Sequence, residues 1–370
     1  MKVGLVTIYQ VPNYGSVLQA YASQCILENY GVDCEIINYR YPNEWHYRRG
    51  TQRPPKIKRL IRNILPTKKQ RVLDEFRLSN LHLTKPYDSF ECLRLESWDD
   101  YGTFIAGSDQ IWNSRFTHAD PTFLLSFAPN GARRASIASS FAQDSILDEY
   151  VDLFKQELSR FQAISVREET GVRIIKDVLN IKNNVKIILD PTLLLTGETW
   201  LNIFRLKKKY KRKPYILLYL WNYAFNPCPY IYDVVKGFAK KWKIVDVYVL
   251  EGYDKNHPMN ELNVIDCSSS TIPEFMELFA NADLVVTSSF HGTAFALNFG
   301  VPLVSIVPSK PSDDRMTSLC KQLEVKNCVA PIGKELQTIN PCYNVETEQD
   351  LLNAVRMDCL LWIKDEVMGL

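Results

Sequence analysis

The first strand, helix and second strand of the chain lie in the stretch VGLVTIYQVPNYGSVLQAYASQCILENYGVDCEIINY, residues 3–39. The apolar run Val3–Tyr9 predicts a buried strand, and Asn13–Tyr30 carries apolar residues at helical spacing. Gly31 suits the position after a helix end, and Cys34–Tyr39 predicts the next strand. Two strands joined by a helix form the βαβ unit, whose strands are parallel. We therefore expect an α/β fold.

Short apolar strands continue to alternate with helical periodicity along most of the chain. This pattern predicts two doubly wound, Rossmann-like domains facing a cleft. We expect an N-terminal domain at 1–204, a basic linker at 205–213, a C-terminal domain at 214–345 and a C-terminal helix at 346–370. That helix could pack back on the N-terminal domain. A proline-containing basic insertion at 42–71 interrupts the first domain, and we expect it to leave the sheet, with some helix at 56–64.

The composition excludes several protein classes. The 370 residues are 46% apolar and 23% charged, which is typical of a soluble globular protein of about two domains. No apolar run reaches the roughly 18 residues of a membrane span. The nine cysteines contain no C-x-x-C pair, and the five histidines lack metal-ligand spacing. G-x-G-x-x-G, P-loop and G-x-S-x-G motifs are absent as well. We predict a cytoplasmic protein with no cofactor and no dedicated metal site.

The net charge of +2 conceals two basic clusters. Residues 47–73 contain ten Lys and Arg and no acid, and residues 205–213 contain seven more. The rest of the chain carries 27 basic against 42 acidic residues. Such clusters attract phosphates, nucleic acid or an anionic membrane face, although a solvated loop without a partner is the alternative. Tyr47 is the single aromatic residue of the first cluster, so nucleic acid is disfavoured.

Polar residues follow the predicted strands at their carboxyl ends. After the first strand, Asn13 can cap a helix and Gly15 allows close approach, which favours a bound anion. A capped helix start without a ligand is the alternative. After strand Thr103–Ala106 come Ser108, Asp109, Gln110, Trp112 and Asn113. Carboxylate, amide and indole groups together suit polyol recognition, whereas a capping Asp beside a core Trp is the alternative.

A third junction joins strand Leu284–Thr287 to a helix predicted at Thr293–Phe299. It places His291 between Ser289 and Gly292, where an imidazole can act as acid or base or donate to a phosphate. A structural histidine is the alternative.

Two arginines lie in comparable positions. Arg315 could hold a carboxylate or phosphate bidentately, or could pair at the surface with Asp313 or Asp314. Arg167 and Glu168 follow strand Ala163–Val166 and could instead form a surface pair.

Taken together, these junctions resemble the polysaccharide pyruvyl transferase family. The matching elements, in family order, are residues 13–22, Gly107–Asn113, Ala138–Phe141, Ser165–Glu168, Leu189–Thr192 and Ser289–Thr293. The resemblance implies a fold similar to GT-B glycosyltransferases. It also implies transfer of pyruvate from phosphoenolpyruvate to two sugar hydroxyls, which forms a ketal. Acceptors in the family are glycans or lipid-linked precursors, such as polyprenyl-diphosphate oligosaccharides, in the synthesis of capsule, exopolysaccharide and other envelope polysaccharides.

The resemblance assigns roles to the candidate residues. We expect His291 as acid, base or phosphate partner and Asp109 as the group that orients or deprotonates the acceptor. The expected donor contacts are Asn13, Gly15, Ser289, Gly292, Arg315 and Arg167, and the expected acceptor contacts are Ser108, Gln110, Trp112, Asn113 and Glu168. The turns bearing Asn13, Asp109 and His291 should then converge on one gap.

One departure from the family pattern concerns the donor. The family element carries Arg two positions before the His, and Ser289 stands there in this chain. Arg315 or Arg167 could supply the missing charge. The departure slightly favours a nucleotide-sugar glycosyltransferase as the alternative function, and a non-catalytic glycan-binding protein is a second alternative. We expect the basic segments 47–71 and 205–213 to contact the inner face of the membrane.

Overall fold

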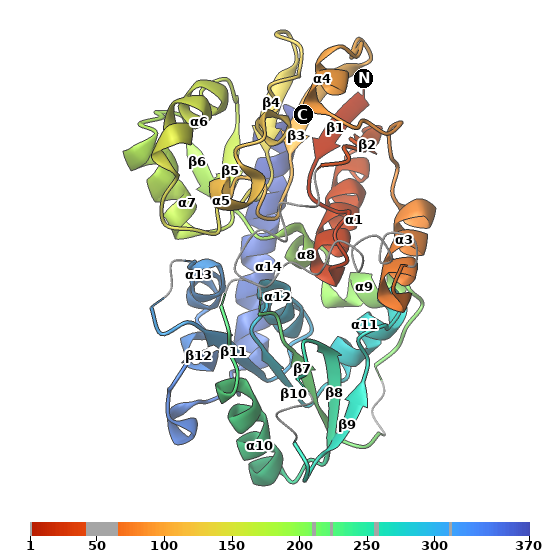
Figure 1. Ribbon diagram of the computed structural model, residues 1–370, viewed down its shortest axis with the longest axis vertical. Coiled ribbons are helices and arrows are strands. Elements are labelled where there is room, and N and C mark those ends of the chain that lie inside the picture. The colour runs from red at the N-terminus through yellow and green to blue at the C-terminus, as the bar shows by residue number, and fades with distance from the viewer. Residues whose placement is uncertain (1, 42–65, 209–211, 223–224, 255–258, 311–312) are drawn as a thin grey trace, which may run out of the picture. The chain divides into compact units, whose positions relative to one another are not determined.

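The computed structural model describes residues 2–41, 66–208, 212–222, 225–254, 259–310 and 313–370 (Figure 1). The chain forms two compact units, which we call the first and second units. The first comprises Met1–Leu194 and Arg356–Leu370, and the second comprises Leu195–Val355. The predicted helix at 56–64, with most of the basic insertion at 42–71, lies outside the described residues.

The first unit contains a parallel sheet in the order β2-β1-β3-β4. Its strands are β1 (Lys2–Val6), β2 (Cys34–Ile36), β3 (Tyr101–Ala106) and β4 (Arg133–Ser136). Strands β5 (Ile164–Val166) and β6 (Val185–Ile187) pair in parallel, and isolated bridges join β5 and its flanks to the β4 region. This order, with the chain reversing direction beside β1, is a doubly wound arrangement whose ligands bind at the carboxyl ends of the strands.

The helices of the first unit connect these strands. They are α1 (Tyr14–Glu28), α3 (Lys68–Asn80), α4 (Phe90–Arg94), α5 (Ser114–Thr117), α6 (Val151–Leu158), α7 (Glu169–Arg173), which continues as a π-helical turn (Ile174–Val178), and α8 (Pro191–Leu194). Short 3-10 turns lie at Pro121–Leu124 and Asp148–Tyr150. Helix α1 is almost wholly buried, which matches its few charged residues.

Helix α3 was not predicted, because its pattern begins inside the basic cluster. Thr67 caps its start, and Leu73, Phe76 and Arg77 form its buried side. Phe76 packs edge-on against Tyr21 of α1, with ring centroids 5.4 Å apart. The end of the basic cluster is therefore part of the fold and not an excursion from it.

The second unit contains a six-stranded parallel sheet in the order β12-β11-β10-β7-β8-β9, the Rossmann order. The strands are β7 (Tyr215–Tyr219), β8 (Asp246–Glu251), β9 (Asn263–Asp266), β10 (Leu284–Thr287), β11 (Leu303–Val307) and β12 (Val329–Pro331). The helices are α9 (Gly197–Ile203), α10 (Tyr230–Trp242), α11 (Ile272–Ala280), α12 (Phe290–Asn298), α13 (Arg315–Gln322) and α14 (Val345–Trp362), which ends in a π-helical turn (Ile363–Met368). Two 3-10 turns lie at Lys326–Cys328 and Leu336–Thr338.

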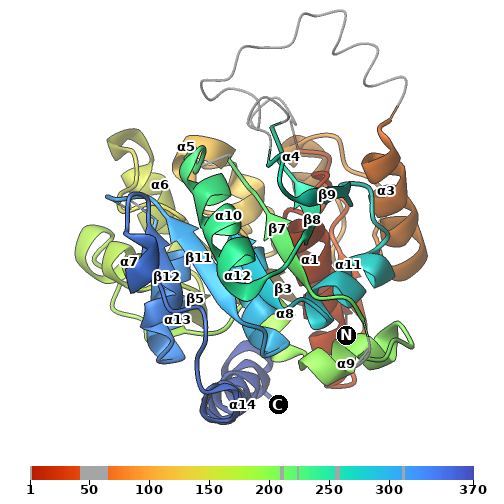
Figure 2. The ribbon, with the colours of Figure 1, turned by 90° about the horizontal axis from the view of Figure 1, so that it is seen from below.

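Alternation along the central strand β7 gives this sheet two buried faces. Ile216 and Leu218 belong to the core that includes α10, whereas Tyr219 packs against Phe275 of α11, with ring centroids 5.9 Å apart. Side chains on both faces of a parallel sheet must be covered, which explains the continuous apolar sequence of β7. The sheet and its helices can be followed in Figure 2.

The boundary between the units differs from the predicted linker at 205–213. The chain enters the second unit at Leu195, and α9 belongs there instead of in a domain ending at 204. Trp200 of α9 packs on Phe295, with ring centroids 5.9 Å apart, and Asn298 Nδ2 donates to the Leu195 carbonyl at 2.8 Å. These apolar and hydrogen-bonding contacts attach α9 to the second unit and so set the boundary between the units at Leu195. No change in composition indicates this boundary in the sequence.

Residues in the predicted linker also have structural roles. Lys208 Nζ donates to the Phe299 carbonyl at 3.0 Å, and burial lowers the pKa of this lysine. Arg212 pairs with Asp283 at 2.6 Å.

The C-terminal residues 346–370 do not belong to one unit. The start of α14 belongs to the second unit, and the chain from Arg356 onward belongs to the first. Arg356 Nε donates to the Leu193 carbonyl at 2.7 Å, and Tyr30 Oη donates to the Leu360 carbonyl at 2.7 Å. These contacts attach the end of the chain to the first unit.

Candidate active site

Asp109 lies at the carboxyl end of β3 in a backbone conformation that L-residues rarely adopt, with φ +73°. Ser16 Oγ, from the first turn of α1, donates to Asp109 Oδ2 at 2.7 Å. The Gln110 amide donates to Asp109 Oδ1 at 2.9 Å. Backbone strain of this kind persists only where the surroundings enforce it, and it is common at functional sites. The carboxylate is therefore held in one orientation.

The loop after β1 and the loop after β3 are hydrogen-bonded to each other beside this carboxylate. Thr7 Oγ1 donates to the Ser108 carbonyl at 2.8 Å, and Gln19 Nε2 donates to Thr7 Oγ1 at 2.9 Å. Gly107 permits the approach, since a Cβ there would lie 2.9 Å from the Thr7 Cβ. The contact between Ser16 and Asp109 thus spans two loops that are already fixed to each other.

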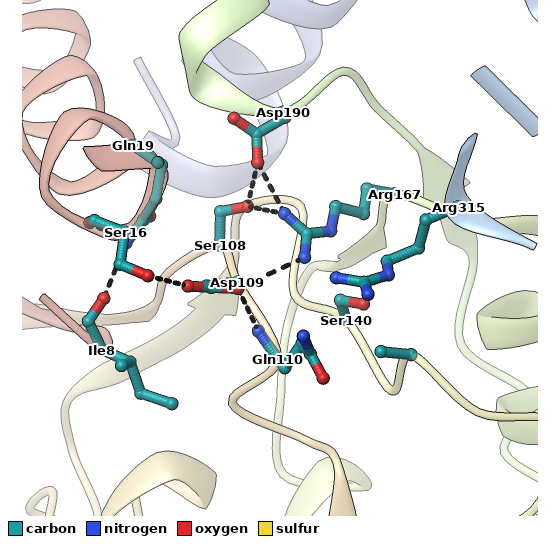
Figure 3. A network of polar contacts seen from close by, with 12 residues as sticks. Ile8, Ser16, Gln19, Ser108, Asp109, Gln110, Ser140, Arg167, Asp190 and Arg315 are labelled. Carbon is teal, nitrogen blue, oxygen red and sulfur yellow. Dashed lines mark hydrogen bonds and ion pairs between the residues drawn. The ribbon is translucent and has the colours of Figure 1, made fainter. Parts of the chain in front are cut away.

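Arg167 links Asp109 to a second carboxylate (Figure 3). Its Nη1 donates to Asp190 Oδ2 at 2.7 Å, and its Nη2 donates to Asp109 Oδ1 at 3.4 Å. Ser108 Oγ donates to the same Asp190 oxygen at 2.8 Å. The side chains of Arg167 and Asp190 are 1% and 0% exposed, and that of Asp109 is 11% exposed. Of these charged groups, Asp109 is the one that reaches solvent.

Glu168 supports the loop after β4. Its Oε1 accepts hydrogen bonds from the Phe141 amide at 2.8 Å and from Ser140 Oγ at 3.0 Å. Ala138 and Ala142 in this loop have φ values of +52° and +49°. The predicted acceptor contact of Glu168 does not fit its complete burial. The carboxylate instead holds a strained loop in place.

The remaining candidates of the β3 loop differ in burial. Trp112 is 0% exposed, and its Nε1 donates to the Phe123 carbonyl at 3.1 Å, so it is a core residue in place of the predicted acceptor contact. Asn113 is buried and donates from Nδ2 to Gln110 Oε1 at 3.0 Å. Gln110 is half-buried and is the predicted acceptor contact of this loop that is most open to solvent.

The β1–α1 junction contains the predicted helix cap. Asn13 Oδ1 accepts a hydrogen bond from the Gly15 amide at 2.8 Å and so caps α1. Arg77 of α3, which no sequence pattern indicated, is a second support of this loop, because its Nη1 donates to the Tyr9 carbonyl at 2.9 Å. Burial lowers the pKa of Arg77 to about 10 and raises the pKa of Tyr9 to about 12. Only the approach of α3 to this loop reveals the role of Arg77.

In the second unit, α12 begins at Phe290, three residues before the predicted start. Ser289 is its N-cap and accepts a hydrogen bond from the Gly292 amide at 3.4 Å. His291 therefore lies in the first turn, is 6% exposed, and packs against the Phe290 ring with centroids 5.3 Å apart. Gly292 is required because a Cβ there would lie 2.9 Å from the Thr287 Cβ.

Arg315 lies beside the same turn. Its guanidinium carbon is 5.8 Å from the centroid of the Phe290 ring. Its Nε donates to Asp313 Oδ1 at 2.8 Å and its Nη2 donates to Oδ2 at 2.5 Å. Arg315 is 7% exposed and the Asp313 side chain is 18% exposed, so the alternative pairing with Asp313 is present as a partly buried bidentate pair.

The structure thus gathers the candidate residues into one cluster in each unit. The first-unit cluster is centred on Asp109 and Arg167, and the second-unit cluster is centred on His291 and Arg315. That both clusters meet around one ligand stays a prediction.

Over the described residues, no group of three or more His, Cys, Asp or Glu side chains is arranged to hold a metal ion. No helix in the described parts of the chain is both long and apolar enough to cross a bilayer.

Comparison with known proteins locates the chain within a fold and a family. Among curated proteins, none matches it. Two solved structures share its fold, a protein from Listeria monocytogenes assigned as a UDP-N-acetylglucosamine 2-epimerase and the UDP-GlcNAc 2-epimerase of Neisseria meningitidis bound to UDP-GlcNAc. The first has a TM-score of 0.57 and 9% identity, over 99% of this chain and 96% of that chain. The second has a TM-score of 0.53 and 11% identity, over 100% of both chains.

These likenesses, together with the parallel sheets, show a two-domain Rossmann-like fold of GT-B type. The model of one family, described as polysaccharide pyruvyl transferase, matches residues 13–310. The match includes the loops that carry Asp109, Arg167 and His291. The chain belongs to the polysaccharide pyruvyl transferase family.

Proposed function

We propose that this protein transfers pyruvate from phosphoenolpyruvate to two hydroxyls of a glycan or a polyprenyl-diphosphate-linked oligosaccharide in envelope polysaccharide synthesis. Family membership supports a glycan-modifying transferase. The observation that carries the proposal is the fixed orientation of the Asp109 carboxylate. Ser16 and Arg167 hydrogen-bond to it at the end of β3, where the backbone of Asp109 is left-handed. A carboxylate fixed in this way can accept a hydrogen bond from a sugar hydroxyl without reorganising.

The reaction forms two C–O bonds at C2 of the donor and breaks the bond between C2 and the phosphate oxygen. A proton reaches the CH₂ carbon, which becomes a methyl group, and one hydroxyl attacks C2. Phosphate leaves, and the second hydroxyl closes the ketal. The two hydroxyl protons balance those taken up by the CH₂ carbon and by phosphate, so no oxidant or reductant is needed. The reaction therefore calls for one acid and one base.

Asp109 is the proposed acceptor-side group, because its carboxylate is oriented and reaches solvent. His291 is the proposed acid, base or phosphate partner. It lies in the first turn of α12, where the helix dipole favours an anion. Asn13, Gly15, Ser289 and Gly292 remain proposed donor contacts at the two helix starts.

Turnover provides the direct test. Labelled phosphoenolpyruvate is incubated with lipid-linked oligosaccharides from the source cell, with and without a chelator, and products are identified by mass and by the ketal methyl resonance. Asp109→Asn and His291→Ala should lose turnover and keep the circular dichroism of the parent. His82→Ala is the matched control, since His82 is exposed and pairs with Glu28. Parent-like activity of either site variant would remove that residue from the mechanism.

The same assay separates the alternative functions. Release of phosphate with a ketal methyl resonance supports pyruvyl transfer. Release of a nucleoside diphosphate from nucleotide sugars would instead indicate a glycosyltransferase, which Ser289 in place of the family Arg favours. Glycan binding without turnover of any donor would indicate a non-catalytic member of the family.

The basic segments support a peripheral contact with the anionic inner face of the membrane, where such an acceptor would be anchored. Each Lys or Arg near such a surface contributes about 1 kcal/mol. Lys69 and Arg212 are engaged in the fold, over the rings of Tyr14 and Tyr215. The test therefore replaces the Lys and Arg residues of 48–62 by Gln and measures sedimentation with vesicles that contain phosphatidylglycerol. Equal pelleting of parent and variant would refute the contact.

A further inference from the structure

An open surface cavity of about 400 Å³ lies on the second unit, between the end of α13 and the start of α14, and its lining Asn and Glu residues are exposed. Its volume lies within the roughly 300–1,000 Å³ of small-molecule sites. Asn327, Asn340, Asn344 and Glu324 line it, together with Tyr343 and Cys342. None of these residues was a candidate in the sequence, and none belongs to the clusters around Asp109 or His291.

The lining amides are oriented by the backbone around them. Asn340 Oδ1 accepts a hydrogen bond from the Cys342 amide at 3.2 Å, and Asn344 Oδ1 accepts one from the Thr347 amide at 3.1 Å. Since the oxygen of each carboxamide is used, the Nδ2 group of each is left to donate. Tyr343 is fixed as well, because its Oη donates to the Val301 carbonyl at 2.8 Å.

The charge of the lining restricts the ligand. Glu324 is its one charged residue, and it supplies acceptor oxygens beside the amide donors. A phosphate or carboxylate would be repelled by Glu324 and would meet no cation in this lining. Donors and acceptors together, without net positive charge, match the hydroxyls of a neutral sugar.

We propose that this cavity binds a neutral sugar residue of the glycan and so forms a carbohydrate subsite separate from the residues proposed for the chemistry. The glycan as its source rests on the proposed function, whereas sugar binding itself can be measured without any donor or turnover.

Cys342 provides the readout, because it lines the cavity and is exposed. Of the nine cysteines, Cys92 is the other exposed one, and it belongs to the first unit. Carbamidomethylation of both thiols by iodoacetamide, which releases iodide, can be followed by mass spectrometry in the intact protein. Cys92 then serves as the internal control.

The probes are methyl glycosides of glucose, galactose, mannose, N-acetylglucosamine and N-acetylgalactosamine, with inorganic phosphate for comparison. At a concentration ten times its dissociation constant, a bound glycoside should slow the modification of Cys342 about tenfold. The modification of Cys92 should not change. Protection by inorganic phosphate alone, or by no glycoside, would overturn the proposal.

Two variants test the amide donors without removing the local caps. Asn340→Asp and Asn344→Asp keep the oxygen that accepts the backbone N–H and lose the Nδ2 donor. Each should abolish the protection of Cys342, measured as the ratio of its modification rates without and with sugar in the same variant, since the added carboxylate by itself slows alkylation of the thiol. Protection that persists in both variants would overturn the assignment. Protection of Cys342 by a glycoside without pyruvyl transfer would support the subsite and refute the proposed function. Pyruvyl transfer without protection would support the proposed function and refute the subsite.

Discussion

Replacing Arg167 by Met tests whether the buried charge network holds the first unit together. The Arg167 side chain is 1% exposed, and its partner Asp190 is 0% exposed. Removing the cation leaves Asp109 and Asp190 without their shared partner, which costs roughly 3–5 kcal/mol when a buried pair is broken. Met preserves most of the packing volume, so a lost ion pair and not a cavity would account for the change.

The assay has to report the first unit separately, because two compact units need not unfold together. Urea unfolding is therefore followed by amide hydrogen exchange in peptides from β3, β4 and β5. In the double variant with Asp190→Asn, the loss should be smaller than the sum of the single losses, with a coupling of about 0.5–3 kcal/mol. Arg94→Met, which breaks an exposed pair with Glu91, is the matched control and should leave exchange unchanged.

Two outcomes would refute this reasoning. If Arg167→Met lowers the free energy of unfolding by less than about 1 kcal/mol, the pair of Arg167 and Asp190 contributes no more than an exposed salt bridge does. Additive losses in the double variant would show that Arg167 and Asp190 do not stabilise each other.

Three further perturbations address separate contacts. Ser16→Ala removes the hydroxyl that donates to Asp109. A hydrogen bond to a charged group contributes about 1.5–3 kcal/mol, so this variant should lower kcat at least tenfold in the phosphate-release assay. Ser16→Thr keeps the hydroxyl and should restore activity. Gly292→Ala forces a Cβ against Thr287 and should cost about 1–3 kcal/mol in urea unfolding of the second unit. Burial raises the pKa of Asp120, so its contribution to stability is present below about pH 3.9 and is lost as the pH rises through the raised value. Asp120→Asn should remove that decline from the pH profile of unfolding, and an unchanged profile would contradict it.

Several strands were predictable from the sequence because each of them is a short apolar run ended by polar residues. Strand β10 begins and ends at the predicted residues, and β3 begins two residues before its predicted start at Thr103. The start of α12 was not predictable, because its cap is a serine in a run of Ser and Thr, each of which can cap a helix. Helix α3 and the boundary at Leu195 depend on contacts with distant segments, which local periodicity does not reveal.

The candidate site divides in a similar way. Asp109, Arg167 and His291 were predicted as candidate site residues from their residue type and from their position at the end of a strand. Their partners depend on tertiary pairing, as in the contact between Ser16 and Asp109 across 93 positions. Burial was the other unknown, since Trp112 lies in a polar loop and yet is a core residue.

The charges of the two clusters suggest how the donor could be held without the family Arg at position 289. Each candidate guanidinium already has a carboxylate partner, Asp190 and Asp109 for Arg167 and Asp313 for Arg315. An anionic donor must therefore displace a carboxylate. Asp190 is 0% exposed and also accepts from Thr192, whereas the Asp313 side chain is 18% exposed. A carboxylate that can turn towards water loses less on displacement than one that must stay buried. We therefore expect Arg315 to be the better donor contact, and Arg315→Ala should weaken phosphoenolpyruvate binding more than Arg167→Ala does. Unchanged binding in both variants would exclude a donor role for either arginine.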